Sequence, residues 1–434
     1  MLKKQKRRLS SWRRKRKPPL NGERTLLNLY NTLTGKTELF KPAEGMNVKM
    51  YTCGPSTYLQ PHIGNYRTFL FEDTLQRYLE YIGYNVTRLI TLTDVEDKAI
   101  TQAKKENLTV EELTKKNEAI FFGDFKLLKI KTPDYSVRAS SAVNQAAMLV
   151  TQLLDKGYAY WYKHEGAMNV YFDPLKFSGF GKLAHLDMNK WPKKRRRFHM
   201  DTYPGTPWNM GDFILWHGCG LYNVCYDTLI GSGRPAWNIQ DAAIVTQHLG
   251  FQVDVACGGI DNVVRHHDYT LAIAESVSGK QFSRYWLHGG HLFVNHKKMS
   301  KSTGNVYYTN DILAKGFSGD HLRFFLTYAP YREKLNFTFE KIAETSKKLD
   351  SLKNMIKDMQ TSKSEHSDSK AQKLAKTVLP VFESTMDNNL DVKTAFDNIY
   401  GAITELQGAA LGSEDIKSLV ADLRRADSVL QCIF

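Results

Sequence analysis

The chain has 434 residues, of which 42% are hydrophobic, and a formal net charge of +15. A chain of this length and composition can bury large cores in two domains or in one domain with appendages. No apolar run approaches the roughly 20 residues that span a bilayer, which excludes an integral helical membrane protein and any membrane partner.

The positive charge is concentrated before the first acidic residue, Glu23. Ten lysines and arginines lie between Lys3 and Lys17, which leaves +5 (15 minus 10) for the rest of the chain. We expect residues 1–24 to form a disordered basic arm. It either binds RNA phosphates, with release of counterions, or is a solvated tail that serves as a targeting segment. A second basic cluster, Lys193 to Arg197, adds to the case for RNA.

Two apolar runs, 48–53 and 86–92, flank a segment whose apolar residues recur at helical spacing. This order of strand, loop, helix and strand predicts a βαβ crossover with parallel strands. The residues from His62 to Asn65 then fall at the N-terminus of the helix. Free N–H groups and the helix dipole favour phosphate at such a position.

A long insertion, at about residues 99–212, is expected to separate the two halves of the sheet. Within it, helical periodicity at 142–154 precedes a strand at 168–172. The second half begins near Phe213 and includes an apolar strand, 251–257, that leads into Gly258, Gly259 and Asp261. Glycines let a backbone approach a nucleoside closely, and a carboxylate can accept hydrogen bonds from ribose hydroxyls.

Lys298 and Lys301 lie on a loop rich in serine, threonine and glycine. Such a loop suits a mobile segment that closes over a polyphosphate, where one cation can stabilise developing charge by about 3 kcal/mol. Combined with the His62 segment upstream, this loop predicts an ATP site.

From Phe337 onward the pattern is helical and is broken by a polar stretch at 362–370. We therefore expect an α/β protein in which a Rossmann-like parallel sheet, with its connecting insertion, occupies residues 25–330. A helical bundle should follow over residues 331–434.

These motifs, in this order, resemble those of the class I aminoacyl-tRNA synthetases, and among them the cysteinyl-tRNA synthetases. The similarity runs nearly to the C-terminus and leaves out only the first twenty-odd residues and the stretch near Lys193. It is carried by Met50–Pro55, His62–Asn65, Leu92–Lys98, Tyr171–Asp173, Gly211–Trp216, Gly233–Trp237, Gly258–Asp261, Lys298–Lys301 and Leu423–Leu430.

The resemblance implies that the chain activates an amino acid with ATP. His62 and Asn65 would contact ATP, while Lys298 and Lys301 would stabilise the charge that develops during the reaction. Gly258, Gly259 and Asp261 would hold the adenosine, and Mg²⁺ is expected on the phosphates.

The resemblance also implies a zinc site that selects cysteine, which the family builds from two cysteines, a histidine and a glutamate. The matching positions in this chain are Cys53, Asp241, His266 and Thr270. Because a carboxylate replaces one thiolate and threonine replaces the glutamate, zinc binding is left open, with His267 or Asp268 as substitutes. Without zinc, packing alone would favour binding of cysteine over serine or alanine by only about 1–3 kcal/mol. A substrate other than cysteine is therefore an alternative.

Thr93 and Trp237 match positions of the family that contact the amino acid, so we expect them to frame its side chain. Transfer to tRNA is the expected second step. One alternative is a ligase with a small-molecule amine acceptor, similar to the cysteine ligases of mycothiol synthesis, because the family's further anticodon-reading domain has no counterpart in this chain. Another is a catalytically silent RNA-binding paralogue.

The five cysteines are odd in number and include no CxxC pair, which favours a reducing interior over a disulfide framework. We therefore expect a cytoplasmic protein. We also expect a monomer. The cysteines are Cys53, Cys219, Cys225, Cys257 and Cys432.

Overall fold

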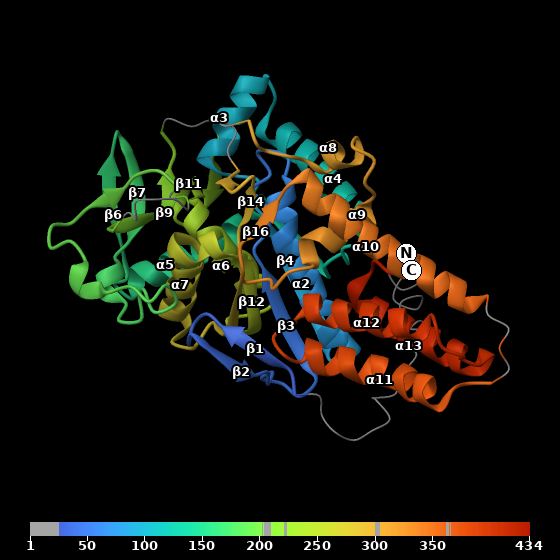
Figure 1. Ribbon diagram of the computed structural model, residues 1–434. Helices are drawn as coiled ribbons and strands as arrows, with labels where there is room; N and C mark the ends of the chain where they lie inside the picture. The colour runs from blue at the N-terminus through green and yellow to red at the C-terminus, as the bar shows by residue number, and fades with distance from the viewer. Residues whose placement is uncertain are drawn as a thin grey trace, which may run out of the picture.

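A parallel five-stranded sheet forms the centre of the computed structural model, which describes residues 26–201, 203, 210–220, 224–299, 304–361, 364 and 366–434. Its strand order is β13-β12-β3-β4-β5, and every neighbouring pair is parallel (Figure 1). The parallel sheet expected from the sequence is thereby confirmed. The strands are β3 (Asn47–Thr52), β4 (Asn85–Leu92), β5 (Tyr135–Arg138), β12 (Val253–Gly259) and β13 (Ser283–Gly289).

The expected βαβ crossover is also present, because α2 (Ile63–Tyr81) connects β3 to its parallel neighbour β4. Successive residues of a strand point to opposite faces of a sheet. On β3, Met50 packs into a core that the sheet shares with the C-terminal helices. Tyr51 packs into a second core, with helices α5 (Val143–Asp155), α6 (Trp237–His248) and α7 (Asp268–Ser278). The central sheet is therefore covered on both faces.

The chain between β5 and β12, which we call the insertion from here on, carries a second sheet with the order β10-β11-β9-β7-β6 and a short strand, β8, beside β9. It therefore begins later than residue 99 and extends past residue 212, because β5 belongs to the central sheet and the strands within 212–235 join β7 in the second sheet. It lies on the opposite side of the central sheet from the C-terminal helices (Figure 1, green). Its strands are β6 (Ala159–His164), β7 (Ala167–Phe172), β8 (Arg197–Phe198), β9 (Asp212–Gly218), β10 (Tyr226–Thr228) and β11 (Gly231–Pro235).

Seven further helices belong to the described part of the chain before the C-terminal helices. In α5, alanines, leucines and valines recur on the buried face, as the sequence periodicity predicted. These helices are α3 (Asp97–Glu106), α4 (Val110–Leu127), α5 (Val143–Asp155), α6 (Trp237–His248), α7 (Asp268–Ser278), α8 (Thr309–Leu313) and α9 (Gly319–Thr327).

Four helices follow to the C-terminus and pack against α2 and α9 (Figure 1, orange and red). Their buried residues join those of α2 and the sheet in one core, so the bundle supports the helix that begins with the His62 motif. The helices are α10 (Phe339–Gln360), α11 (Ser369–Met386), α12 (Val392–Leu406) and α13 (Ser413–Leu430).

Two small sheets complete the fold. One is an N-terminal hairpin, and the other, with the order β15-β14-β16, carries Lys298 at the end of β15. The strands are β1 (Asn28–Asn31), β2 (Lys36–Leu39), β14 (Leu292–Val294), β15 (Lys297–Lys298) and β16 (Leu335–Phe337). Among the described helices, none is long and apolar enough to cross a membrane.

The sequence favoured reduced cysteines without disulfides, and the structure differs at one pair. Cys219 and Cys225 form a disulfide, whereas Cys53, Cys257 and Cys432 are free. Cys219 directly follows β9 and Cys225 directly precedes β10, and both strands pair with β11. The sheet therefore brings the two thiols together, with Cα atoms 6.0 Å apart, although their spacing matches no familiar disulfide or metal motif.

Candidate active site

A cleft of about 440 Å³ lies at the carboxyl ends of β3 and β12, where open parallel sheets bind their ligands. It brings together residues that are more than 200 positions apart in the sequence. The predicted site residues that line it are Cys53, His62, Asn65, Thr93, Trp237, Gly259 and Asp261.

The first turn of α2 forms one wall of the cleft. Its backbone N–H groups are not free, although the sequence predicted free N–H groups that favour phosphate. The N–H of His62 donates to Asn65 Oδ1, and the N–H of Gly64 donates to His62 Nδ1. The N–H groups of Ile63 and Asn65 donate to carbonyl oxygens of Tyr307 and His62. The first N–H groups of this helix are thus already paired, so His62 and Asn65 face the cleft as side chains on a capped helix rather than as part of an open phosphate cradle.

The glycine segment after β12 divides between two environments. Gly259 and Asp261 line the cleft, where the Asp261 carboxylate can meet the hydroxyl groups of a sugar. Gly258 instead makes room for a neighbouring ring, because a Cβ there would lie 2.5 Å from Cε1 of His267. Gly258 is not among the described residues that line the cleft, and its expected role in approaching the nucleoside stays a prediction.

The lysine loop meets the His62 motif through Met299. Met299 lines the cleft, and a Cβ atom on Gly64 would lie only 2.3 Å from Cε of Met299. Gly64 therefore leaves room for the methionine side chain. Lys298 is exposed on β15 and is not among the described residues that line the cleft. Lys301 lies outside the described residues, so its role remains an expectation from the sequence.

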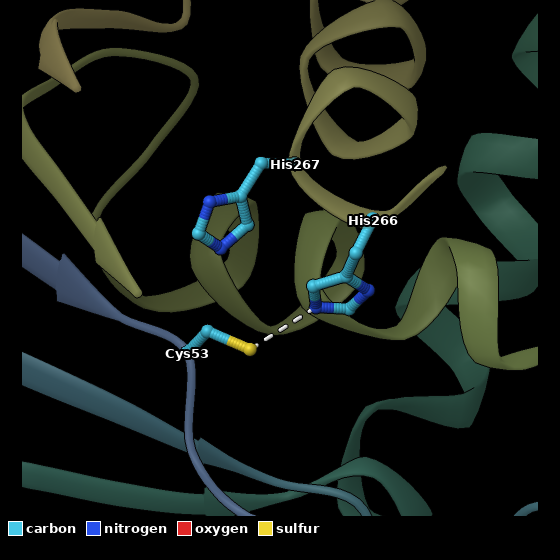
Figure 2. Close-up of side chains that lie close together, drawn as sticks. All are labelled: Cys53, His266 and His267. Carbon is cyan, nitrogen blue, oxygen red and sulfur yellow. Dashed lines mark hydrogen bonds between the residues drawn. The ribbon is translucent and has the colours of Figure 1, made fainter. Parts of the chain in front are cut away.

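At the opposite end of the cleft, three side chains meet behind its wall. The indole of Trp237 stacks on the imidazole of His266, with ring centroids 4.3 Å apart. The thiol of Cys53 lies 3.1 Å from Nε2 of His266 (Figure 2). Since Cys53, Trp237 and Thr93 line the cleft while His266 is fully buried, this is the end that can receive a small side chain.

Asp241, a predicted metal ligand, does not line the cleft and belongs to a buried network beside it. Its carboxylate accepts a hydrogen bond from the hydroxyl of Tyr51 and lies 2.9 Å from Nε2 of His266. Burial alone would raise the pKa of Asp241, but the neighbouring His266 outweighs it, and the net pKa is lowered. Burial, with the nearby Asp241 carboxylate, raises the pKa of the Cys53 thiol.

The fourth predicted zinc position, Thr270, is fully buried on α7, and its hydroxyl has no hydrogen-bond partner among the described residues. A neutral hydroxyl is a poor zinc ligand, and Asp241 is held by Tyr51. The residues at the family's four positions therefore do not fit the family's zinc site.

Sequence reasoning missed a polar side of the cleft formed by Lys98 and Tyr203. Nζ of Lys98 lies 3.4 Å from the ring centroid of Tyr203, and both residues line the cleft. Burial lowers the pKa of Lys98, and burial of the neighbouring Glu96 raises its pKa to about 7. Lys98 belongs to the segment that carries the family resemblance, which is the signal that could have indicated it.

A buried ionic network fixes the position of Trp237. Asp201 accepts hydrogen bonds from the backbone N–H groups of Trp237 and Asp97. Arg234 contacts the carboxylates of Asp97 and Asp201, and His217 Nε2 lies 3.0 Å from Asp201. The network joins the loop after β4 to the insertion, so both halves of the fold position the aromatic wall.

The second basic cluster is partly used within the protein. Arg195 forms ion pairs with Asp173 and Asp212, and Arg197 stacks on the ring of Tyr162 at 3.9 Å. Lys193, Lys194 and Arg196 are exposed. Only part of this cluster is therefore available for the RNA contact predicted from its charge.

Comparison with known proteins agrees with this geometry. The family model of the class I (C) tRNA synthetase catalytic domain matches residues 39–347. The chain belongs to the class I tRNA synthetases. It is 35% identical over 408 residues to a cysteine–tRNA ligase of Koribacter versatilis, covering 93% of this chain and 81% of that protein. It is also 35% identical over 422 residues to the cysteine–tRNA ligase of Chlamydia pneumoniae, covering 93% and 86%.

Solved structures of other class I synthetases share the fold. The methionyl-tRNA synthetase of Mycobacterium tuberculosis bound by methionyl-adenylate has a TM-score of 0.63 and 15% identity, covering 89% of each chain. A LeuRS of Agrobacterium radiobacter K84 in a ternary complex with tRNA and LeuAMS has a TM-score of 0.64 and 11% identity, covering 91% of this chain and 85% of that one. At these identities the similarity extends to the fold alone. Together with the family match, it assigns the fold to a class I synthetase.

Proposed function

We propose that the protein activates cysteine with ATP and transfers it to the 3′ end of tRNA. The observation that carries the proposal is that one cleft joins the His62 turn, Asp261 and Met299 of the lysine loop to a thiol-lined end at Cys53. Membership of the synthetase family and the names of the relatives, cysteine–tRNA ligases, support the choice of substrate.

In the first half-reaction, a carboxylate oxygen of the amino acid attacks the α-phosphorus of ATP. The new P–O bond gives an aminoacyl adenylate, and the bond to the β-phosphate breaks to release pyrophosphate. The enzyme contributes positioning and stabilisation of charge, with ATP brought as its Mg²⁺ complex. Asp261 would hold the ribose, while His62, Asn65, Lys298 and Lys301 would lie along the polyphosphate.

In the second half-reaction, a hydroxyl of the terminal tRNA ribose attacks the activated carbonyl, and AMP leaves. The cleft ends at Trp237 and Cys53, so the carbonyl of a small amino acid would lie between these residues and the phosphates. Thr93 would frame the same side chain from the loop after β4.

The test of the acceptor is a charging assay with cysteine, ATP and total tRNA. The proposal predicts a base-labile cysteinyl ester on tRNA, formed at the expense of ATP. Adenylate formation without charging, followed by consumption of the adenylate when an amino sugar is added, would instead identify the ligase with a small amine acceptor. Charging of tRNA with a different amino acid would contradict cysteine as the substrate, but would still support tRNA as the acceptor.

A further inference from the structure

The disulfide between Cys219 and Cys225 is more open to reaction than the other cysteines of the chain. Both residues of the pair are exposed. Cys257 and Cys432 are buried, and Cys53 is partly buried in the wall of the cleft. Burial raises the pKa of each of these three free thiols, so little of the reactive thiolate forms. Exchange with thiols or disulfides in solution is therefore directed to the exposed pair.

The disulfide links the two strands on either side of β11. Within that strand, Gly233 pairs with Gly218 of β9 on one side and with Tyr226 of β10 on the other. These two partners are the direct neighbours of Cys219 and Cys225. The N–H of Cys219 also donates to a carbonyl oxygen of β11. The covalent link therefore fixes the separation of β9 and β10 at one level of β11.

The same strands position the aromatic wall of the cleft. Arg234 of β11 is buried, and its guanidinium contacts the carboxylates of Asp97 and Asp201. Nε2 of His217, on β9, lies 3.0 Å from the Asp201 carboxylate. Asp201 in turn accepts the backbone N–H of Trp237 at 2.8 Å. Two of the strands that the disulfide holds together thus fix the carboxylate that places Trp237.

A second route leads from Cys225 to the amino-acid end of the cleft. Val224 and Tyr226, the two neighbours of Cys225, line a cavity of about 240 Å³. Asp94, from the loop after β4, lines the same cavity. The preceding residue of that loop, Thr93, lines the cleft. A movement at Cys225 therefore acts on the loop expected to frame the amino acid as well as on the aromatic wall.

We propose that Cys219 and Cys225 are a site of reversible thiol–disulfide exchange with low-molecular-weight thiols, and that the oxidised pair holds the cleft in the form that binds the amino acid more tightly. In the reducing compartment expected from the sequence, protein disulfides are usually transient, catalytic or redox-sensing. Exposed disulfides are also the ones that exchange readily. The inference rests on the proposed function only for the choice of cysteine as the exchanging thiol.

The exchange is balanced by two molecules of the small thiol. The thiolate of the first attacks one sulfur of the pair, which forms a mixed disulfide and releases the other protein sulfur to take up a proton. The thiolate of the second attacks the mixed disulfide, which releases the second protein thiol and one small disulfide. The protein gains two electrons and two protons, and two molecules of cysteine are oxidised to cystine. Excess cystine drives the same steps backwards.

The exchange itself is tested by trapping free thiols of the native full chain with N-ethylmaleimide in buffers of graded cysteine-to-cystine ratio. Peptide mass spectrometry should find Cys219 and Cys225 unlabelled in excess cystine and both labelled in excess cysteine. The label on Cys257, which is buried, should not change with the ratio. A pair that stays oxidised in excess cysteine, or stays reduced in excess cystine, would overturn the proposal.

Hydrogen exchange tests the effect on the strands without turnover. Reduction should speed amide exchange within residues 231–235 by at least about fivefold, the lower end of usual couplings between sites. Exchange within α11, which lies in the C-terminal bundle, should stay the same. The double variant Cys219→Ser/Cys225→Ser should exchange like the reduced protein even in excess cystine. Equal protection of residues 231–235 in the oxidised and reduced forms contradicts the proposed action on the cleft.

Pyrophosphate exchange tests the effect on the amino acid. Oxidised wild type, mixed with cysteine below its KM, should start fast and slow by about fivefold as the pair is reduced, because KM rises. Saturating cysteine should hide this change, and the double variant should be slow from the start. A constant wild-type rate during reduction contradicts tighter binding by the oxidised form. Reversible labelling of the pair in a protein that activates no amino acid would refute the proposed function and leave the exchange site standing.

Discussion

At the scale of single residues, Asn65 has two roles that substitutions can separate. Its side chain accepts the N–H of His62 and caps α2, and it also lines the cleft. Asn65→Asp retains an acceptor for the cap but puts a negative charge beside the polyphosphate, whereas Asn65→Ala loses the cap as well. We expect both variants to lower kcat/KM for pyrophosphate exchange by about 10²–10³, the scale of removing one charge-stabilising donor.

Thermal unfolding provides the control for that pair. Asn65→Ala should lose about 1 kcal/mol of stability, as for other lost helix caps, and Asn65→Asp should lose less. An Asn65→Asp variant with the exchange rate of the wild type would show that this side chain does not face ATP.

Trp237 gives a prediction for the amino-acid end of the cleft. Since its indole stacks on His266 and lines the cleft, Trp237→Ala should raise KM for the amino acid while KM for ATP stays within a factor of two. A loss of about 1–3 kcal/mol corresponds to a roughly 5–150-fold increase in that KM. Trp237→Phe, which keeps an aromatic surface, is the matched control and should change KM much less. Equal effects on both substrates would mean that Trp237 supports the whole fold instead.

At the scale of elements, a buried ion pair holds α2 against its neighbours. Asp73 on α2 pairs with Arg323 of α9 at 2.7 Å, and Arg323 also donates to the carbonyl oxygens of Leu128 and Leu430. The ends of α4 and α13 are thus joined to the helix that begins with His62. Removing one partner of such a buried pair leaves an unpaired charge, which costs about 3–5 kcal/mol.

This pair leads to a stability prediction with a defined pH dependence. Burial alone would raise the pKa of Asp73, but the guanidinium groups of Arg323 and Arg77 lower it below its usual value. A carboxyl with a lowered pKa in the folded state stabilises above its unfolded pKa, and that contribution is lost as the pH falls through the folded pKa. The difference in unfolding free energy between wild type and Asp73→Asn should therefore be constant from pH 8 to 5 and shrink below about pH 4.

Urea unfolding across this pH range provides the measurement. Glu414→Gln, at a side chain that is 84% exposed, is a control that should leave the midpoint at pH 7 unchanged. A difference between wild type and Asp73→Asn that grows on acidification would contradict the assignment of Asp73 as the buried anion of this pair.

The elements also show what the sequence could predict. The strands at 48–53 and 86–92 and the intervening helix were predictable because their apolar spacing is local. The pairing of the first N–H groups of α2 was not, because one acceptor, the carbonyl of Tyr307, is far along the chain. Likewise, the sequence named Asp241 as a ligand, but the structure pairs its carboxylate with Tyr51 and His266. Local pattern predicted elements and motifs, while tertiary contacts decide which polar atoms remain for ligands.

At the scale of the whole molecule, the positive charge predicts how tRNA binds. The basic arm, residues 1–24, lies outside the described residues, while Lys193, Lys194 and Arg196 are exposed on the insertion. Deleting residues 1–17 should weaken tRNA binding and flatten its dependence on salt, because each phosphate contact contributes roughly 0.7–0.9 to the slope. Substituting glutamine for the three exposed residues should reduce the slope by at most about 3.

Pyrophosphate exchange, which needs no tRNA, is the control for both variants and should be unchanged. Binding that is unaffected by the deletion and by the triple substitution would show that neither basic segment contacts tRNA. The matched substitution Arg195→Gln removes an arginine that is already paired, so it should alter the slope less than loss of an exposed lysine.

The measurement that tests the central claim most directly is ATP–pyrophosphate exchange with each of the twenty amino acids, with Lys301→Ala as the inactive control. The account predicts exchange with cysteine, at least tenfold above serine and alanine, and strong loss in the control variant. Exchange with another amino acid in preference to cysteine would contradict the proposed substrate. Absence of exchange with all twenty would contradict amino-acid activation itself.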